Sequence, residues 1–260
     1  YSLDEAKLEN AITPNTKAII AVHLQGQMCN MEAISAICTK YQLHLIEDCA
    51  QSHFSEFKGK RAGLFGIAGS FSFYPGKNLG AYGDAGCIIT NNDQLAEACR
   101  MYANHGALQK HQHKIEGINS RLDGLQAAVL TAKLPYILEW TQKRIEKASL
   151  YQQYLQNIKE ISLPLQRPLT KHTFHLYVIR AQNRNKLLQY LKEKGVETAI
   201  HYPTALPNLP AYKYLQYGQH DFPVATMLQE EILSLPVYPE LTEEMIQYVA
   251  RCIQDFYTGA

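Results

Sequence analysis

Apolar and polar residues along the first half of the chain follow a pattern that predicts strands connected by helices. Two short apolar runs, residues 18–22 and 43–47, flank residues 31–40, where apolar side chains recur at helical spacing. Parallel neighbouring strands need such a crossover, so this order predicts a strand–helix–strand unit of a parallel sheet. Further elements are expected at residues 4–12 and 93–105 (helices) and at residues 67–73 and 86–90 (strands).

A long helical stretch divides the chain. Residues 122–134 and 136–158 both carry apolar side chains at helical spacing, and Pro135 interrupts the pattern between them. We expect this stretch to leave the first domain, so the sequence predicts a large domain over residues 1–150 and a small domain over residues 151–260. The small domain is expected to be α+β, with a strand at residues 173–180 and helices at residues 184–194 and 241–256.

Composition narrows the class of protein. With 25 Lys and Arg residues against 24 Asp and Glu, the formal net charge is +1, which gives no broad basic surface for nucleic acid or anionic membrane. The apolar run at residues 18–22 is far shorter than a membrane helix, and no signal-peptide pattern occurs. The six cysteines contain no CxxC pair, which is typical of reduced thiols. We expect a globular, cytoplasmic protein.

Candidate chemistry follows two of the predicted strands. Asp48 and Gln51 come directly after residues 43–47, and ligands of open α/β sheets bind outside the carboxyl ends of the strands. Lys77 follows Pro75 after an aromatic-rich strand, a setting that can desolvate an amine and lower its pKa. Taken singly, these residues also have ordinary interpretations, a turn-capping acid and a solvated lysine.

Spacing excludes two nucleotide motifs and a metal site. The phosphate-loop pattern GxxxxGK[ST] fails because its first position is Phe71 and the residue after Lys77 is Asn78. The dinucleotide pattern GxGxxG does not occur, which argues against a dehydrogenase. Two histidine pairs have no carboxylate or thiol ligands at supporting spacing, so no metal is expected at either of them: His111 with His113, and His172 with His175.

Several strings of residues occur in a distinctive order. They are VHLQGQ (22–27), IEDCAQ (46–51), FSFYPGKNLGAYGDAG (71–86), NSRLDGLQAA (119–128), HYPTALP (201–207) and FPVAT with LSLPVYPEL (222–241). Together they resemble the DegT/DnrJ/EryC1/StrS family of pyridoxal-phosphate (PLP) sugar aminotransferases over nearly the whole chain. The resemblance implies an α/β fold of the type I, aspartate-aminotransferase-like class. The expected parts are a large domain with a mixed or parallel sheet, which lacks the N-terminal elements of the family, and a small C-terminal α+β domain.

The resemblance also implies a role for particular residues. Lys77 would form a covalent Schiff base with PLP and then move a proton between the donor carbon and the cofactor. Asp48 would keep the pyridine nitrogen protonated, Gln51 would contact the ring face or its phenolic oxygen, and Ser72 would bind the phosphate. Asn119 would reach the phosphate in the neighbouring subunit, so a homodimer with shared active sites follows.

Three further side chains, Tyr74, His201 and Tyr202, match family positions near the sugar nucleotide. Phenols and imidazoles in loops also serve packing and hydrogen bonding alone, so these roles are open. His23 is a weaker candidate of the same kind.

The implied activity is transfer of an amino group, with glutamate as the expected donor, to a nucleotide-linked ketosugar. The expected acceptor is a dTDP-3-keto-6-deoxyhexose, and ping-pong kinetics would result. The family's PLP-dependent sugar dehydratases carry His where this chain has Lys77, so the lysine argues for transamination. Two further functions are compatible with the same residues: that of a 4-amino-sugar transaminase, and that of a non-catalytic regulatory or remnant member of the family.

Overall fold

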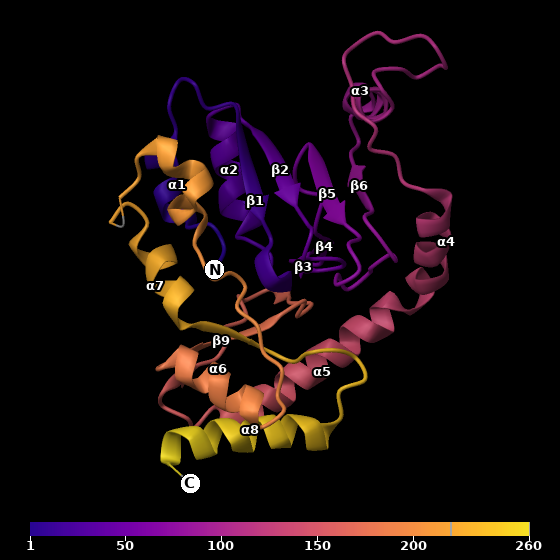
Figure 1. The fold of residues 1–260 in the computed structure, drawn as a ribbon. Coiled ribbons are helices and arrows are strands. Elements are labelled where there is room, and N and C mark those ends of the chain that lie inside the picture. The colour runs from indigo at the N-terminus through magenta and orange to yellow at the C-terminus, as the bar shows by residue number, and fades with distance from the viewer. Residues whose placement is uncertain (219, 260) are drawn as a thin grey trace. The chain divides into compact units, whose positions relative to one another are not determined.

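The structure, a computed structural model, describes residues 1–218 and 220–259 (Figure 1). These residues form two compact units. The first unit contains residues 1–142 and 166–175, and the second contains residues 143–165 and the described residues from Leu176 onward. The chain therefore leaves the first unit, returns to it for ten residues and leaves again, which no pattern along the sequence indicated.

The first unit is built on a mixed four-stranded sheet in the order β1-β2-β5-β6. The first three strands are parallel and β6 runs antiparallel to β5. Helix α2 (Met31–Lys40) is the crossover between β1 and β2, and the side chain of Asn30 caps it by accepting a hydrogen bond from the Ala33 N–H. The strand bounds are β1 Ala18–Val22, β2 His44–Asp48, β5 Ala68–Ser72 and β6 Gly86–Ile89.

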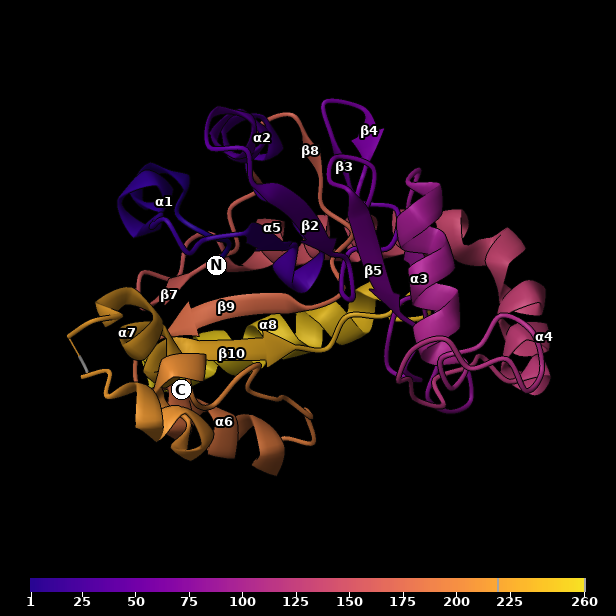
Figure 2. The same cartoon turned by 90° about the horizontal axis from the view of Figure 1, so that it is seen from above.

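One face of this sheet is buried under α2, which lies beside β1 and β2 in Figure 1. Figure 2 shows the same elements from above. Side chains alternate along a strand, so every second residue of β1 and β2 points into this core. The core combines strand residues with the inward side of α2: Ile19, Ala21, Leu45, Met31, Ile34 and Cys38.

The opposite face of the sheet carries exposed apolar residues. Ile20 of β1 is 56% exposed and Ile88 of β6 is 53% exposed. Val22 pairs with Asp48, and Asp48 pairs with Ser70 of β5, so these three side chains share this face at the carboxyl ends of their strands. The fold therefore presents the Asp48 carboxylate on the open side of the sheet.

A second, small sheet holds the returning segment in the first unit. Strand β8 (Thr170–Lys171) pairs antiparallel with β3 (Glu56–Phe57), which also pairs with β4 (Lys60–Arg61). The remaining elements of this unit are α1 Glu5–Ala11, η1 Leu24–Gly26, α3 Asp93–Ala103, α4 Gly124–Lys133 and η2 Leu134–Tyr136.

The second unit has a three-stranded antiparallel sheet in the order β10-β9-β7. Helix α8 packs its apolar side against α6, and the Thr242 side chain caps α8 by accepting from the Met245 N–H. The strand expected from residue 173 begins only at Tyr177, because Thr173 to His175 bond to the first unit instead. The elements are β7 Ile161–Ser162, β9 Tyr177–Ala181, α6 Arg184–Glu193, η3 Leu206–Asn208, η4 Pro210–Leu215, α7 Pro223–Glu231, β10 Ile232–Leu235 and α8 Glu243–Thr258.

Helix α5 (Ile137–Leu155) begins in the first unit and ends in the second. Neither this helix nor any other in the described part of the chain has the length and apolar character needed to cross a membrane.

Candidate active site

Lys77 and Asp48 are the centre of the candidate site. Lys77 lies in a turn in which its N–H donates to the Tyr74 carbonyl at 2.8 Å, and its side chain is half-buried. Burial lowers the pKa of the Lys77 amine, and the negative charge of Asp48 opposes this shift in part. The amine is thus close enough to the Asp48 carboxylate to sense its charge, and it deprotonates more readily than a solvated lysine.

Asp48 itself is half-buried at the end of β2. Its Oδ1 accepts a hydrogen bond from the Ala50 N–H at 2.9 Å, which fixes the carboxylate at the start of the following turn. Ser72 ends the neighbouring parallel strand β5, and its Oγ accepts from the Tyr74 N–H at 3.3 Å. Asp48 and Ser72 are therefore the last residues of two adjacent parallel strands.

The glycine-rich turn after Lys77 is held tightly. A Cβ atom at Gly80 would lie 2.3 Å from the Pro75 carbonyl oxygen, so only glycine fits there without movement. The Lys133 amine donates to the Gly80 carbonyl at 2.7 Å, and the Gln126 side chain accepts from the Tyr82 N–H at 2.8 Å. Helix α4 thereby fixes the far side of the turn that carries Lys77.

Gln51 is buried, and its Oε1 accepts from the Gln25 N–H at 2.6 Å. Gln25 has a φ of 62°, so this bond holds a left-handed residue in the turn after β1. The contact between Gln51 and a cofactor stays a prediction.

Ser72, Tyr74 and Asn119 line one cavity of about 960 Å³ in the first unit. Asn119 Oδ1 accepts from Arg121 Nε at 3.1 Å, and Arg121 lines the same cavity. Neither Lys77 nor Asp48 is among its lining residues. Ser72 and Asn119 of the same chain thus line one cavity, whereas the resemblance implies that Asn119 reaches the phosphate in the neighbouring subunit.

His201 and Tyr202 lie in the second unit. His201 Nδ1 is 2.8 Å from the Ser234 hydroxyl, and Tyr202 is 52% exposed. Their predicted contact with a sugar nucleotide stays a prediction.

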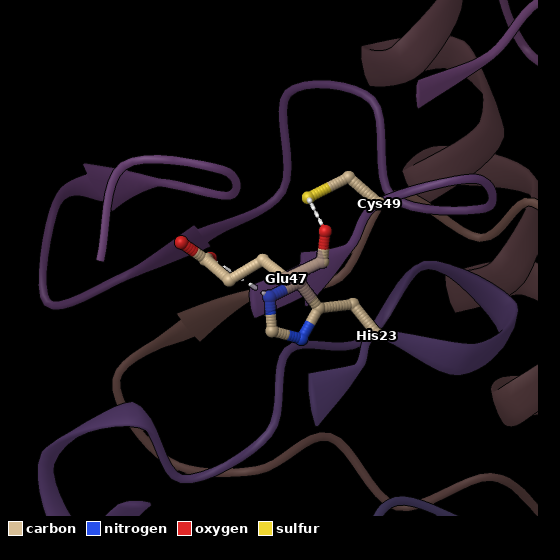
Figure 3. Close-up of side chains that lie close together, drawn as sticks. All are labelled: His23, Glu47 and Cys49. Atoms are coloured by element: carbon tan, nitrogen blue, oxygen red, sulfur yellow. Dashed lines mark hydrogen bonds and ion pairs between the residues drawn. The ribbon is translucent and has the colours of Figure 1, made fainter. Parts of the chain in front are cut away.

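Glu47, which precedes Asp48 in β2, is a buried structural residue beside the candidate site. Figure 3 shows its side chain pointing toward His23, and the distance from Glu47 Oε2 to His23 Nε2 is 3.0 Å. The other ring nitrogen of His23 accepts from the Cys29 N–H at 3.3 Å. Three backbone N–H groups also donate to the Glu47 carboxylate, at 2.6 to 2.9 Å: Gly63, Phe65 and Gly66.

These bonds use both ring nitrogens of His23 and both carboxylate oxygens of Glu47, so the group is a hydrogen-bonded brace rather than a free ligand set. Cys49, the third member in Figure 3, donates its thiol to the Glu47 backbone carbonyl at 3.8 Å, and burial raises the pKa of that thiol. Burial alone would raise the pKa of the Glu47 carboxyl. The bonds from His23, Gly66 and Gly63 outweigh it, and the pKa lies below its ordinary value.

A sequence signal for Glu47 exists. Alternation along β2 places residue 47 on the same inward face as Leu45, and a carboxylate at a core position must be paired or hydrogen-bonded.

His53 is a second buried group beside the site. The centroid of its ring lies 5.6 Å from the ring centroids of both Phe71 and Phe73. Burial lowers the pKa of His53 to about 4, and the charge of Lys77 acts in the same direction. The imidazole is therefore neutral near pH 7 and adds no positive charge beside Lys77.

Comparison with known proteins gives consistent matches. The sequence model of the DegT/DnrJ/EryC1/StrS aminotransferase family matches residues 1–254. A pleiotropic regulatory protein of Geobacillus stearothermophilus is 45% identical over 99% of this chain and 70% of its own length. The dTDP-3-amino-3,6-dideoxy-alpha-D-galactopyranose transaminase of Aneurinibacillus thermoaerophilus is 42% identical over 98% of this chain and 70% of its own length.

A solved structure is similar throughout. The crystal structure of S. venezuelae DesV in complex with a ketimine intermediate matches with a TM-score of 0.95 and 37% identity, covering 98% of this chain and 69% of that chain.

Proposed function

This chain belongs to the DegT/DnrJ/EryC1/StrS aminotransferase family, and from that premise we propose that it transfers an amino group from glutamate to a dTDP-3-keto-6-deoxyhexose. The family and the α/β, aspartate-aminotransferase-like fold class expected from the sequence strings are confirmed. The observation that carries the proposal is the half-buried Lys77 amine near the Asp48 carboxylate, at the carboxyl edge of the sheet. The 42% identical relative, a dTDP-3-amino-sugar transaminase, supports the choice of acceptor.

The protein is an aminotransferase with pyridoxal 5′-phosphate as cofactor. The residues fit this group, because a partly desolvated amine, a carboxylate and a strand-end hydroxyl are arranged on neighbouring turns: Lys77, Asp48 and Ser72. Bound PLP supplies an electron-accepting ring. Lys77 would hold the cofactor covalently and, once released, carry the proton at its Nζ. Asp48 would hold a proton on the ring nitrogen, and Ser72 would donate to the phosphate.

The test is a two-step titration of the PLP-loaded protein. Glutamate should change the visible absorption of the cofactor and yield 2-oxoglutarate, and the dTDP-ketosugar should then restore the starting spectrum. A folded protein that binds PLP but gives neither change would overturn the proposal. It would favour the second candidate, a regulatory protein, which the name of the 45% identical relative supports.

Replacing Asp48 tests the role of the carboxylate. Asp48→Asn should retain PLP but slow both half-reactions about 10- to 100-fold, because a charge-assisted contact worth ~1.5–3 kcal/mol becomes a neutral one. Stopped-flow absorbance with each substrate measures the two rates. Asp93→Asn, at an exposed residue of α3, is the control. Rates equal to those of the control would remove Asp48 from the site.

We also propose a cytoplasmic homodimer with shared sites, in which Asn119 serves the neighbouring subunit. Asn119 is exposed and its side chain is joined to Arg121, so the pair can face a second copy. The sugar nucleotide would contact Tyr74, which lines the Ser72 cavity. The roles of His201 and Tyr202, which lie in the second unit, stay predictions of the family resemblance. The six free cysteines support a reducing compartment.

Assembly and cofactor retention should therefore change together. Dilution that separates the subunits should release PLP, and Asn119→Ala should raise the concentration at which release occurs, because one phosphate contact is lost. Analytical ultracentrifugation at the cofactor's absorption band follows both quantities at once. A monomer that keeps PLP would exclude the shared site.

A further inference from the structure

Residues 170–175, here named the anchoring segment, bond to the turn that follows β1. The N–H of Thr173 donates to the Gly26 carbonyl at 3.0 Å. The Thr173 hydroxyl lies 2.9 Å from the Ser55 hydroxyl, which itself donates to the Gly26 carbonyl at 2.7 Å. Thr173 and Ser55 are both fully buried, so these bonds are shielded from water.

The backbone at Gly26 allows this close approach. Its φ is 102°, and a Cβ atom there would lie 2.8 Å from Thr173 Oγ1 and 2.9 Å from the Phe174 nitrogen. Only glycine lets the anchoring segment lie against this turn. The same turn carries Gln25, whose N–H donates to Gln51, so the segment is bonded indirectly to the residues that follow β2.

The anchoring segment also holds the residue next to Lys77. Asn78 is buried, its Nδ2 donates to the Thr173 carbonyl at 3.3 Å, and its Oδ1 is 3.1 Å from His175 Nδ1. Because an amide oxygen only accepts, Nδ1 of His175 carries the proton in this bond. Both ends of one amide are thus bound to a segment that lies about a hundred positions further along the chain.

We propose that Asn78 is a positioning residue for Lys77, acting through its paired bonds to Thr173 and His175. The inference rests on the proposed covalent role of Lys77. Lys77 has a long, flexible side chain, so the placement of its amine depends on how firmly the backbone of its turn is held. On one side α4 holds that turn through Gly80 and Tyr82, and on the other Asn78 is bonded to the anchoring segment. Without the Asn78 bonds, the turn would be held less firmly. The Lys77 amine could then move away from the face of the sheet that carries Asp48.

The test compares covalent capture of PLP with binding of pyridoxamine phosphate. Pyridoxamine phosphate lacks the aldehyde, so its affinity reports the non-covalent contacts and requires no covalent bond to Lys77. Asn78→Ala should slow the borohydride-trappable incorporation of PLP at Lys77 about tenfold or more, because small misplacement of a reacting group is costly. The affinity for pyridoxamine phosphate should stay within about threefold of wild type.

Two further variants make the comparison decisive. His175→Ala removes one of the two hydrogen bonds of the Asn78 side chain and should slow the capture of PLP about threefold. If Asn78→Ala does not fold, the result for His175→Ala tests the inference in its place. Gln27→Ala is the control, because it removes a hydrogen bond of 2.5 Å in which Gln27 Oε1 accepts from the Arg167 N–H. Arg167 lies on the returning stretch but outside the anchoring segment. The capture rate of Gln27→Ala should equal that of wild type.

The outcomes separate cleanly. Capture at the wild-type rate in Asn78→Ala, or in His175→Ala where the first variant does not fold, overturns the inference while the proposed function stands. Equal loss of capture and of pyridoxamine phosphate affinity also overturns it, because that pattern indicates general damage to the site. Wild-type protein that captures PLP on another lysine overturns the role of Lys77 and this inference with it.

Discussion

Lys77→Ala is expected to abolish transamination, with a fall in rate of about 10³-fold or more, because it removes both the covalent attachment and the proton carrier. In the PLP-loaded wild type, borohydride should fix the pyridoxyl group on the peptide that contains Lys77 and on no other. Burial lowers the pKa of this amine, so the rate of capture should reach its plateau at a pH below the ordinary lysine value of about 10.4.

Peptide mapping by mass spectrometry and a capture-rate profile against pH provide the two measurements. Lys110→Ala, at an exposed lysine, is the matched control and should behave as wild type. A pyridoxyl group on a different lysine, or an active Lys77→Ala protein, would contradict the assignment of this site.

Glu47→Leu is expected to lower the free energy of unfolding by about 3–5 kcal/mol, because several buried or partly buried donors lose their acceptor at once. The substitution leaves the N–H groups of Gly63, Phe65 and Gly66 and the Nε2–H of His23 without an acceptor inside the core. Urea denaturation measures the effect, and Glu116→Leu, at an exposed glutamate, is the control. A difference from that control of less than about 0.5 kcal/mol would contradict the role of the carboxylate as a brace.

The same carboxylate predicts a pH dependence. Its pKa in the folded protein lies below the ordinary value of 4.5, so the folded state favours the ionised form. The stabilisation is therefore complete above pH 4.5 and is lost as the pH falls through the folded pKa. The difference in free energy of unfolding between wild type and Glu47→Gln should therefore shrink as the pH falls below the folded pKa of Glu47. A difference that grows would contradict the lowering of this pKa.

Much of the first unit could be predicted from local pattern. Residues 18–48 fold as the expected strand–helix–strand unit because alternation and helical spacing are strong there, and Asp48 follows the strand that the pattern defines. Lys77 lies in a turn after β5, as the sequence pattern indicates, and its role in the site stays a prediction.

What could not be predicted depends on distant partners. The sequence predicts a strand from Thr173, yet the backbone polar groups of Thr173 are satisfied by Gly26 and Asn78. Nothing local to either segment encodes that pairing. The acceptor role of Glu47 likewise depends on a loop at residues 63–66, whose N–H groups converge only in the folded protein.

The return of residues 166–175 to the first unit bears on how this protein can be dissected or recombined. A single cut at residue 150 would strip β8 from β3 and leave Gly26, Ser55 and Asn78 without their partners. The part that carries Lys77 is therefore a discontinuous module, residues 1–142 with residues 166–175. Chimaeras that exchange acceptor preference between relatives should keep both pieces from one parent, with crossovers at 142, 165 and 175 rather than at one point.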